Sequence, residues 1–142
     1  MSNKITLKEA IKFHGHLGPY LILGLLAGEA ALKKLNCRKY FALEVKVWGA
    51  TQKPKSCLID GLQLSTGATY GKGNINKFDG RIIKVEFNNR ENQKQLNLNF
   101  KNSLMKRLEK VKTHQEAELL AKQLSKTSHT KLFSLKLKAL SL

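Results

Sequence analysis

The chain has 142 residues, 42% of them hydrophobic, which is enough to bury the core of a single domain. Its two cysteines are too few for a disulfide framework or a zinc ribbon, and no apolar run reaches the roughly 20 residues of a membrane span or forms a signal-peptide core, so we expect one cytoplasmic domain over residues 1–142. The formal net charge of +16 predicts a surface that attracts nucleic acid or acidic partners, unless it is only a solvated, lysine-rich surface.

Two helices are predicted at the start of the chain. Thr6 can cap the first helix, and Glu9, three residues on, completes a capping box. The second helix runs from about Pro19 to Leu35, because proline suits the first turn of a helix. Its first half is apolar on every face, which is typical of a buried central helix. Gly24 and Gly28 form a stripe of small residues, which predicts that another element packs closely against this helix.

Two histidines stand between these helices. We expect His14 and His16 on a non-helical lead-in to the second helix, where residues two apart can point to the same side. Imidazole groups can bind a metal or transfer a proton near neutral pH. The alternative is one capping and one packing histidine without chemistry.

A strand and a third helix follow. Residues Phe41–Trp48 alternate between apolar and polar, as expected of a strand. The next helix runs from Ser56, as its cap, to about Leu64, and it brings Cys57 and Asp60 onto one face. A cysteine in the first turn of a helix has its thiolate favoured, which suits a metal ligand or nucleophile. The alternative is a buried, inert thiol.

The glycine-rich segment 67–74 contains a lysine but is not a P-loop. The spacing between its glycines is one residue short, and Gly73 stands where a Ser or Thr should hold magnesium. We interpret it as a turn that leads into a strand. Lys72 can reach an anionic ligand from this turn, or can be a solvated lysine.

The second half of the chain predicts strands, then helices, then a last strand. Ile75–Phe78 and Arg81–Phe87 flank Asp79-Gly80, which is the signal of a hairpin with a two-residue turn. Alternation of apolar residues predicts a further strand at residues 96–100 and a last one at 133–137. Between them lie two lysine-rich helices, at about 104–111 and 114–124, and Thr113 with Glu116 can cap the second.

The segments FHGHLGPYLILG and CLIDGLQLSTGATYGKGNI, followed by a strand pair around Asp-Gly, resemble the E-subunit family of formylmethanofuran dehydrogenase. That family is recognised by a Phe-His-Gly-His segment, a Cys-x-x-Asp-x-x-Gln helix and a Gly-x-Thr-x-Gly-Lys-Gly-Asn loop. All three occur here in the family's order. The resemblance covers residues 5–90, within an expected family core of residues 5–100 and a lysine-rich helical extension over 101–142.

The resemblance implies an α+β domain: N-terminal helices, then a mixed or antiparallel sheet with an interleaved helix (order α-β-α-β-β-β), and a C-terminal helical segment. It implies a homodimer and a site for zinc or another divalent transition metal. The implied ligands are His14, His16 and Cys57. Four further residues are implied to line the pocket, Asp60 and Lys72 as catalytic groups and Gln63 and Thr69 as binding groups.

Two departures from the family pattern concern the site. Many family members have a cysteine where this chain has Gly18, and another where it has Ala68. Without these thiols, redox chemistry at the site is not expected and metal affinity is expected to be weaker. The family name does not fix an activity, because the molybdenum or tungsten chemistry of the dehydrogenase resides in its other subunits.

Three functions compete at this stage. The first is a metal pocket that binds or transforms a small molecule, with Asp60 as a base or as a group that orients a ligand, and Lys72 holding an anion. The second is a non-catalytic accessory subunit that docks on an oxidoreductase or another acidic partner through the basic surface. The third is a nucleic-acid-binding module, which the lysine-rich surface alone supports.

Overall fold

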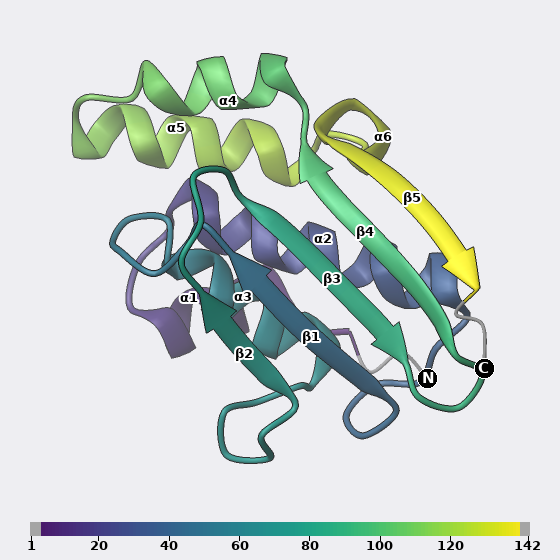
Figure 1. Cartoon of the computed structure of the whole chain (residues 1–142). Helices are drawn as coiled ribbons and strands as arrows, with labels where there is room; N and C mark the ends of the chain where they lie inside the picture. Colours follow the sequence, from purple (N-terminus) through teal and green to yellow (C-terminus); the bar gives the residue numbers. More distant parts are fainter. Residues whose placement is uncertain (1–3, 140–142) are drawn as a thin grey trace.

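The structure, a computed structural model, describes residues 4–139 and is an α+β fold, as predicted (Figure 1). In chain order the elements are α1 (Leu7–His14), α2 (Pro19–Leu35), β1 (Leu43–Trp48), α3 (Cys57–Thr66), β2 (Ile75–Phe78), β3 (Lys84–Asn89), β4 (Lys94–Phe100), α4 (Asn102–Glu109), α5 (His114–Ser125), α6 (His129–Leu132) and β5 (Phe133–Ala139). No helix in this part of the chain is both long and apolar enough to cross a membrane.

The strands form one mixed sheet in the order β2-β1-β3-β4-β5, with β1 and β2 parallel and the other neighbours antiparallel. An apolar row crosses the sheet, in which each residue is paired with the next: Ile75, Val45, Phe87, Leu96 and Leu137. Figure 1 shows α1, α2 and α3 on one face of the sheet, the face toward which this row points. The predicted last strand is confirmed as β5.

The predicted hairpin around Asp79-Gly80 is wrong, because β1 lies between the two strands that were expected to pair. The turn instead crosses the end of β1, where the hydroxyl of Thr51 donates to Asp79 at 3.2 Å. A short Asp-Gly turn specifies a local change of direction, whereas strand pairing depends on distant segments. Here the α3 crossover places β2 parallel to β1 on its outer side, and β3 takes the inner side.

Helices α2 and α3 pack at the very short distance that the glycine stripe predicts. A Cβ atom built on Gly24 would lie 2.3 Å from the carbonyl oxygen of Leu58, and one on Gly61 would lie 2.3 Å from that of Leu21. The hydroxyl of Ser65 reaches across at 3.0 Å to the carbonyl oxygen of Gly24. This contact fixes the start of α3 against the start of α2.

The predicted capping boxes at Thr6 and Thr113 are confirmed, each with its glutamate three residues on. The predicted cap at Ser56 is wrong: Ser56 has helical backbone angles and its side chain makes no capping hydrogen bond. Helix α5 buries Leu120, Ala121 and Leu124 in the core and packs against α2. The C-terminal helices therefore lie close to the start of α2, near the two histidines.

Candidate metal centre

A glycine turn brings the two histidines together. His14 is the last residue of α1, so the prediction that it lies outside a helix is wrong, whereas His16 does lie in the turn. Gly15 between them has a φ of 109° in the left-handed region, and its N–H donates to the carbonyl oxygen of Ile11. No atom would crowd a Cβ on Gly15, so glycine is required for the backbone angle alone. As a result, the two imidazole rings lie 4.7 Å apart.

His14 is held by a carboxylate from α3. Its Nδ1 lies 2.6 Å from Oδ2 of Asp60, and its side chain is only 9% exposed. Because a carboxylate accepts, Nδ1–H is the donor, and the lone pair of the neutral ring is then on Nε2. This Nε2 is buried and has no hydrogen-bond partner among residues 4–139. A buried nitrogen acceptor without a partner is unfavourable, and a bound cation would satisfy it.

Cys57 completes a set of three donors. One ligand atom each from His14, His16 and Cys57 lies within 4.8 Å of the others. Because α3 begins at Cys57, the same helical turn carries Asp60, and the predicted shared face of Cys57 and Asp60 is directed at the histidines. Residues far apart in the chain therefore meet at the start of two closely packed helices.

The expectation that the helix start favours a Cys57 thiolate is wrong. Burial and the nearby Asp60 carboxylate raise the pKa of the Cys57 thiol, and Lys53 lowers it by less. The first N–H groups of α3 are already occupied: that of Cys57 donates to Pro54 and that of Leu58 donates to Lys55. The thiol thus gains nothing from free helix N–H groups, and a bound cation would be needed to favour the thiolate.

A cavity of about 260 Å³ adjoins this set. His16 and Cys57 line one side of it, and residues from α4, α5 and the loop between them line the other. Among these is His114, the first residue of α5, whose ring centroid lies 6.0 Å from that of His16. Sequence reasoning missed His114; the capping box at Thr113 predicted that a helix starts there but not that it starts above His16.

The other three predicted site residues lie at the opposite end of α3, which is about 15 Å long for its ten residues. Gln63 accepts from the backbone N–H of Tyr70 at 3.0 Å. The N–H of Thr69 donates to the side-chain oxygen of Asn74 at 2.9 Å. The ammonium group of Lys72 donates to the carbonyl oxygen of Gly67 and to the Thr69 hydroxyl. The structure does not bring these residues to the donor set.

Gly18, where many family members have a cysteine, is the N-cap of α2, with extended backbone angles that other residues also adopt. A Cβ at this position would lie 3.2 Å from Cε1 of His16. A thiol here would therefore stand at the donor set. Its absence leaves one nitrogen pair and one sulfur as protein ligands.

Comparison with known proteins agrees with this interpretation. Residues 13–140 match the family described as FmdE, molybdenum formylmethanofuran dehydrogenase operon. An FmdE-like protein of the tungsten formylmethanofuran dehydrogenase type from Syntrophus aciditrophicus has the same fold, with a TM-score of 0.65 and 18% identity over 95% of this chain and 71% of that one.

A probable S-adenosyl-L-methionine-binding protein from Archaeoglobus fulgidus is 33% identical over 76 residues, which are 51% of this chain and 21% of the relative. The chain thus spans about a fifth of that curated relative. The family match is far more extensive, since it includes both histidines, Cys57 and the C-terminal helices. On this evidence the chain belongs to the FmdE family.

Proposed function

We propose that this chain binds one divalent transition metal ion, with zinc the preferred ion, through His14, His16 and Cys57, and that the resulting centre binds or transforms a small molecule. The observation that carries the proposal is the buried, unpartnered Nε2 of His14 beside a second imidazole and a thiol. Imidazole nitrogen and cysteine sulfur are normal zinc ligands.

The hydrogen bond from His14 to Asp60 supports the same proposal. Histidines that bind metals commonly donate their other N–H to a carboxylate, which fixes the ring and makes it a better ligand. In this arrangement Asp60 orients His14, and its predicted role as a base gives way to a positioning role. At 2.6 Å the hydrogen bond is short, as expected where the acceptor is charged.

Three protein ligands would leave one coordination position for water or a substrate. A zinc ion in such a centre polarises a carbonyl group or lowers the pKa of a bound water. The adjoining cavity of about 260 Å³ offers space for a small molecule at that position. We therefore favour a small-molecule centre over a purely structural zinc site.

The test is elemental analysis of untagged protein after zinc reconstitution, with matched variants. We expect about one zinc per chain in the wild type, and loss of zinc in Cys57→Ala and His14→Ala. Two residues of the same types provide controls: Cys37→Ala and His129→Ala should retain zinc, because neither belongs to the donor set. Equal zinc content in Cys57→Ala and Cys37→Ala would refute the proposed centre.

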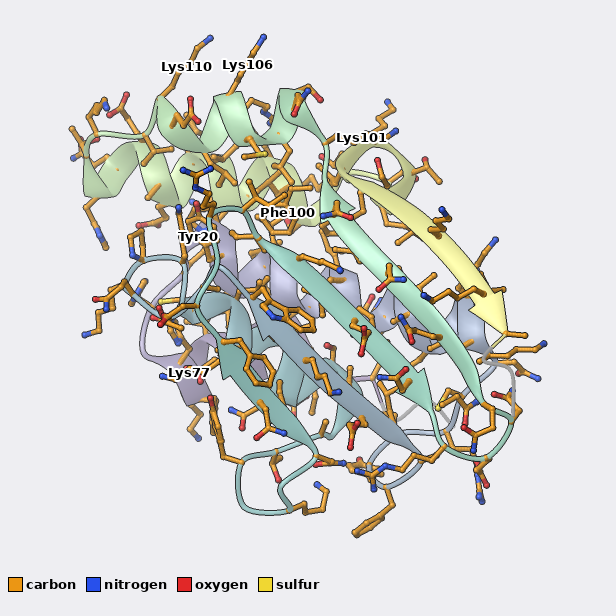
Figure 2. All side chains as sticks on the ribbon, viewed as in Figure 1. Tyr20, Lys77, Phe100, Lys101, Lys106 and Lys110 are labelled. Atoms are coloured by element: carbon orange, nitrogen blue, oxygen red, sulfur yellow. The ribbon has the colours of Figure 1, made fainter. Side chains whose placement is uncertain are left out.

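A second candidate function is that of an accessory subunit, which the basic face of α4 favours. Figure 2 shows Lys106 and Lys110 pointing away from the sheet, and both are exposed. Such a face suits an acidic partner such as an oxidoreductase subunit, and less specifically nucleic acid. The test is co-purification with the oxidoreductase subunits of the same organism at low and high salt; retention of the complex at low salt only would support this function.

The homodimer remains a proposal that rests on the family resemblance. Sedimentation of the purified chain tests it directly: a particle of twice the 16.0 kDa chain mass supports the dimer, and a monomer at micromolar concentration refutes it.

A further inference from the structure

The cavity beside the donor set has a chemical character that narrows the ligand. Its walls are mainly apolar, and they include Leu17 and Pro19 from the histidine side and Leu108, Val111 and Ala117 from the C-terminal helices. Polar groups stand at one end only, where His16, Cys57 and His114 meet. A pocket with one polar end and one apolar end fits a molecule with the same division.

Charge narrows the ligand further. A divalent cation held by two neutral imidazoles and one thiolate keeps a net charge of about +1, which an anionic group would neutralise. The surrounding charges have both signs, since Lys53 acts on Cys57 and Glu109 acts on Tyr20. The cation itself therefore decides the preference, and it favours an anion with an oxygen donor over a neutral or cationic molecule.

His114 is placed to contact such an anion. Its ring lies 6.0 Å from that of His16, yet it is not one of the three residues whose ligand atoms cluster within 4.8 Å. It thus stands across the cavity from the donor set. A ring N–H at this position can donate to an oxygen of a group that is bound to the cation.

Resting on the proposed metal centre, we propose that the cavity binds a short-chain carboxylate. The carboxylate group lies between the metal and His114, and the hydrocarbon chain lies among Leu108, Val111 and Ala117. A volume of about 260 Å³ holds roughly eight or nine groups of the size of a water molecule, which matches the eight heavy atoms of hexanoate.

The experiment uses the full chain loaded with Co²⁺, whose visible spectrum reports ligand binding, and titrates it with acetate, butanoate, hexanoate and decanoate. We expect affinity to rise about fourfold per methylene group up to hexanoate, on the order of 100-fold in all, and then to stop rising. His114→Ala should weaken every carboxylate about tenfold while retaining cobalt. His129→Ala, another histidine at the first residue of a helix, should change nothing.

A second variant separates the two ends of the cavity. Ala117→Phe fills the apolar end, so it should abolish the gain from acetate to hexanoate and leave acetate binding unchanged. If cobalt binds but affinity does not depend on chain length, or if His114→Ala binds carboxylates as the wild type does, the inference is overturned and the metal centre stands. Loss of cobalt in His114→Ala would also overturn it, because His114 would then be a ligand. Failure of the wild type to bind cobalt would refute the proposed function itself.

Discussion

The two ends of helix α3 carry the polar residues that the sequence assigned to a single site, and they differ in how these residues are satisfied. At the first end, the buried Nε2 of His14 has no partner among residues 4–139, and the Cys57 thiol faces it. At the second end, the side chains of Gln63, Thr69 and Lys72 make hydrogen bonds within the loop that they belong to or adjoin.

This difference indicates which residues are available for a ligand. Polar groups that bond to each other stabilise a loop, whereas a buried group without a partner has a free-energy cost that a ligand can remove. Sequence spacing does not distinguish the two cases, because both ends of α3 contain residue types suited to chemistry. The structure favours metal binding at the first end and loop stabilisation at the second.

The largest expected effect concerns the loop end. Asn74 is 3% exposed, and its side chain bonds to Tyr40, Leu43 and Thr69. Asn74→Ala leaves three buried backbone groups without partners, so we expect the free energy of unfolding to fall by about 3 kcal/mol. Zinc affinity, measured on the folded protein, should not change.

Urea denaturation checks this prediction, with the exposed Asn76→Ala of β2 as its control. A large loss of zinc affinity in Asn74→Ala, with the fold intact, would show that the two ends of α3 act as one site after all.

A smaller effect is expected at the site end. Asp60→Asn keeps the shape of the side chain but weakens the bond that orients His14, so zinc affinity should fall about 10- to 100-fold. Competition with a chromophoric chelator measures this affinity. The control is Asp79→Asn, whose carboxylate accepts a hydrogen bond from Thr51 far along the chain and should leave affinity unchanged.

The pH dependence of zinc binding follows from Cys57. Burial and Asp60 raise the pKa of its thiol, so the thiol is protonated near neutral pH and zinc must displace that proton. Below this pKa, the apparent zinc affinity should therefore rise about tenfold for each unit of pH, here between about pH 7 and 8. Cys57→Ala should lose this slope, and a flat profile in the wild type would mean that sulfur is not a ligand.

The smallest effect is expected for Lys72, which is exposed. Its hydrogen bonds to Gly67 and Thr69 lie at the surface of the loop, so Lys72→Ala should lower the free energy of unfolding by about 1 kcal/mol or less. Zinc and hexanoate titrations should match the wild type. A selective loss of hexanoate binding would restore Lys72 to the anion-binding role predicted from the sequence.

Local patterns in the sequence predicted local structure well. Both capping boxes, the buried α2 and the last strand are as expected, since each depends on residues within one or two turns or on alternation along one segment. The glycine stripe at Gly24 and Gly28 also predicted close packing, although it could not identify α3 as the partner.

The errors concern relations between distant segments. The Asp79-Gly80 turn is real, but β1 takes the place that β2 was expected to occupy beside β3. The thiol of Cys57 was expected to be acidified by helix N–H groups that the preceding turn already occupies. His114 reaches the site only because α5 packs against α2, which no pattern near residue 114 reveals.

X-ray absorption at the zinc edge of the reconstituted protein tests the proposed metal centre without relying on any ligand or activity. We predict one sulfur ligand at about 2.3 Å and nitrogen or oxygen ligands at about 2.0–2.1 Å, with the sulfur contribution absent in Cys57→Ala and retained in Cys37→Ala. Zinc bound by nitrogen and oxygen alone in the wild type would contradict the proposed centre, as would a sulfur contribution that disappears with Cys37 instead of Cys57.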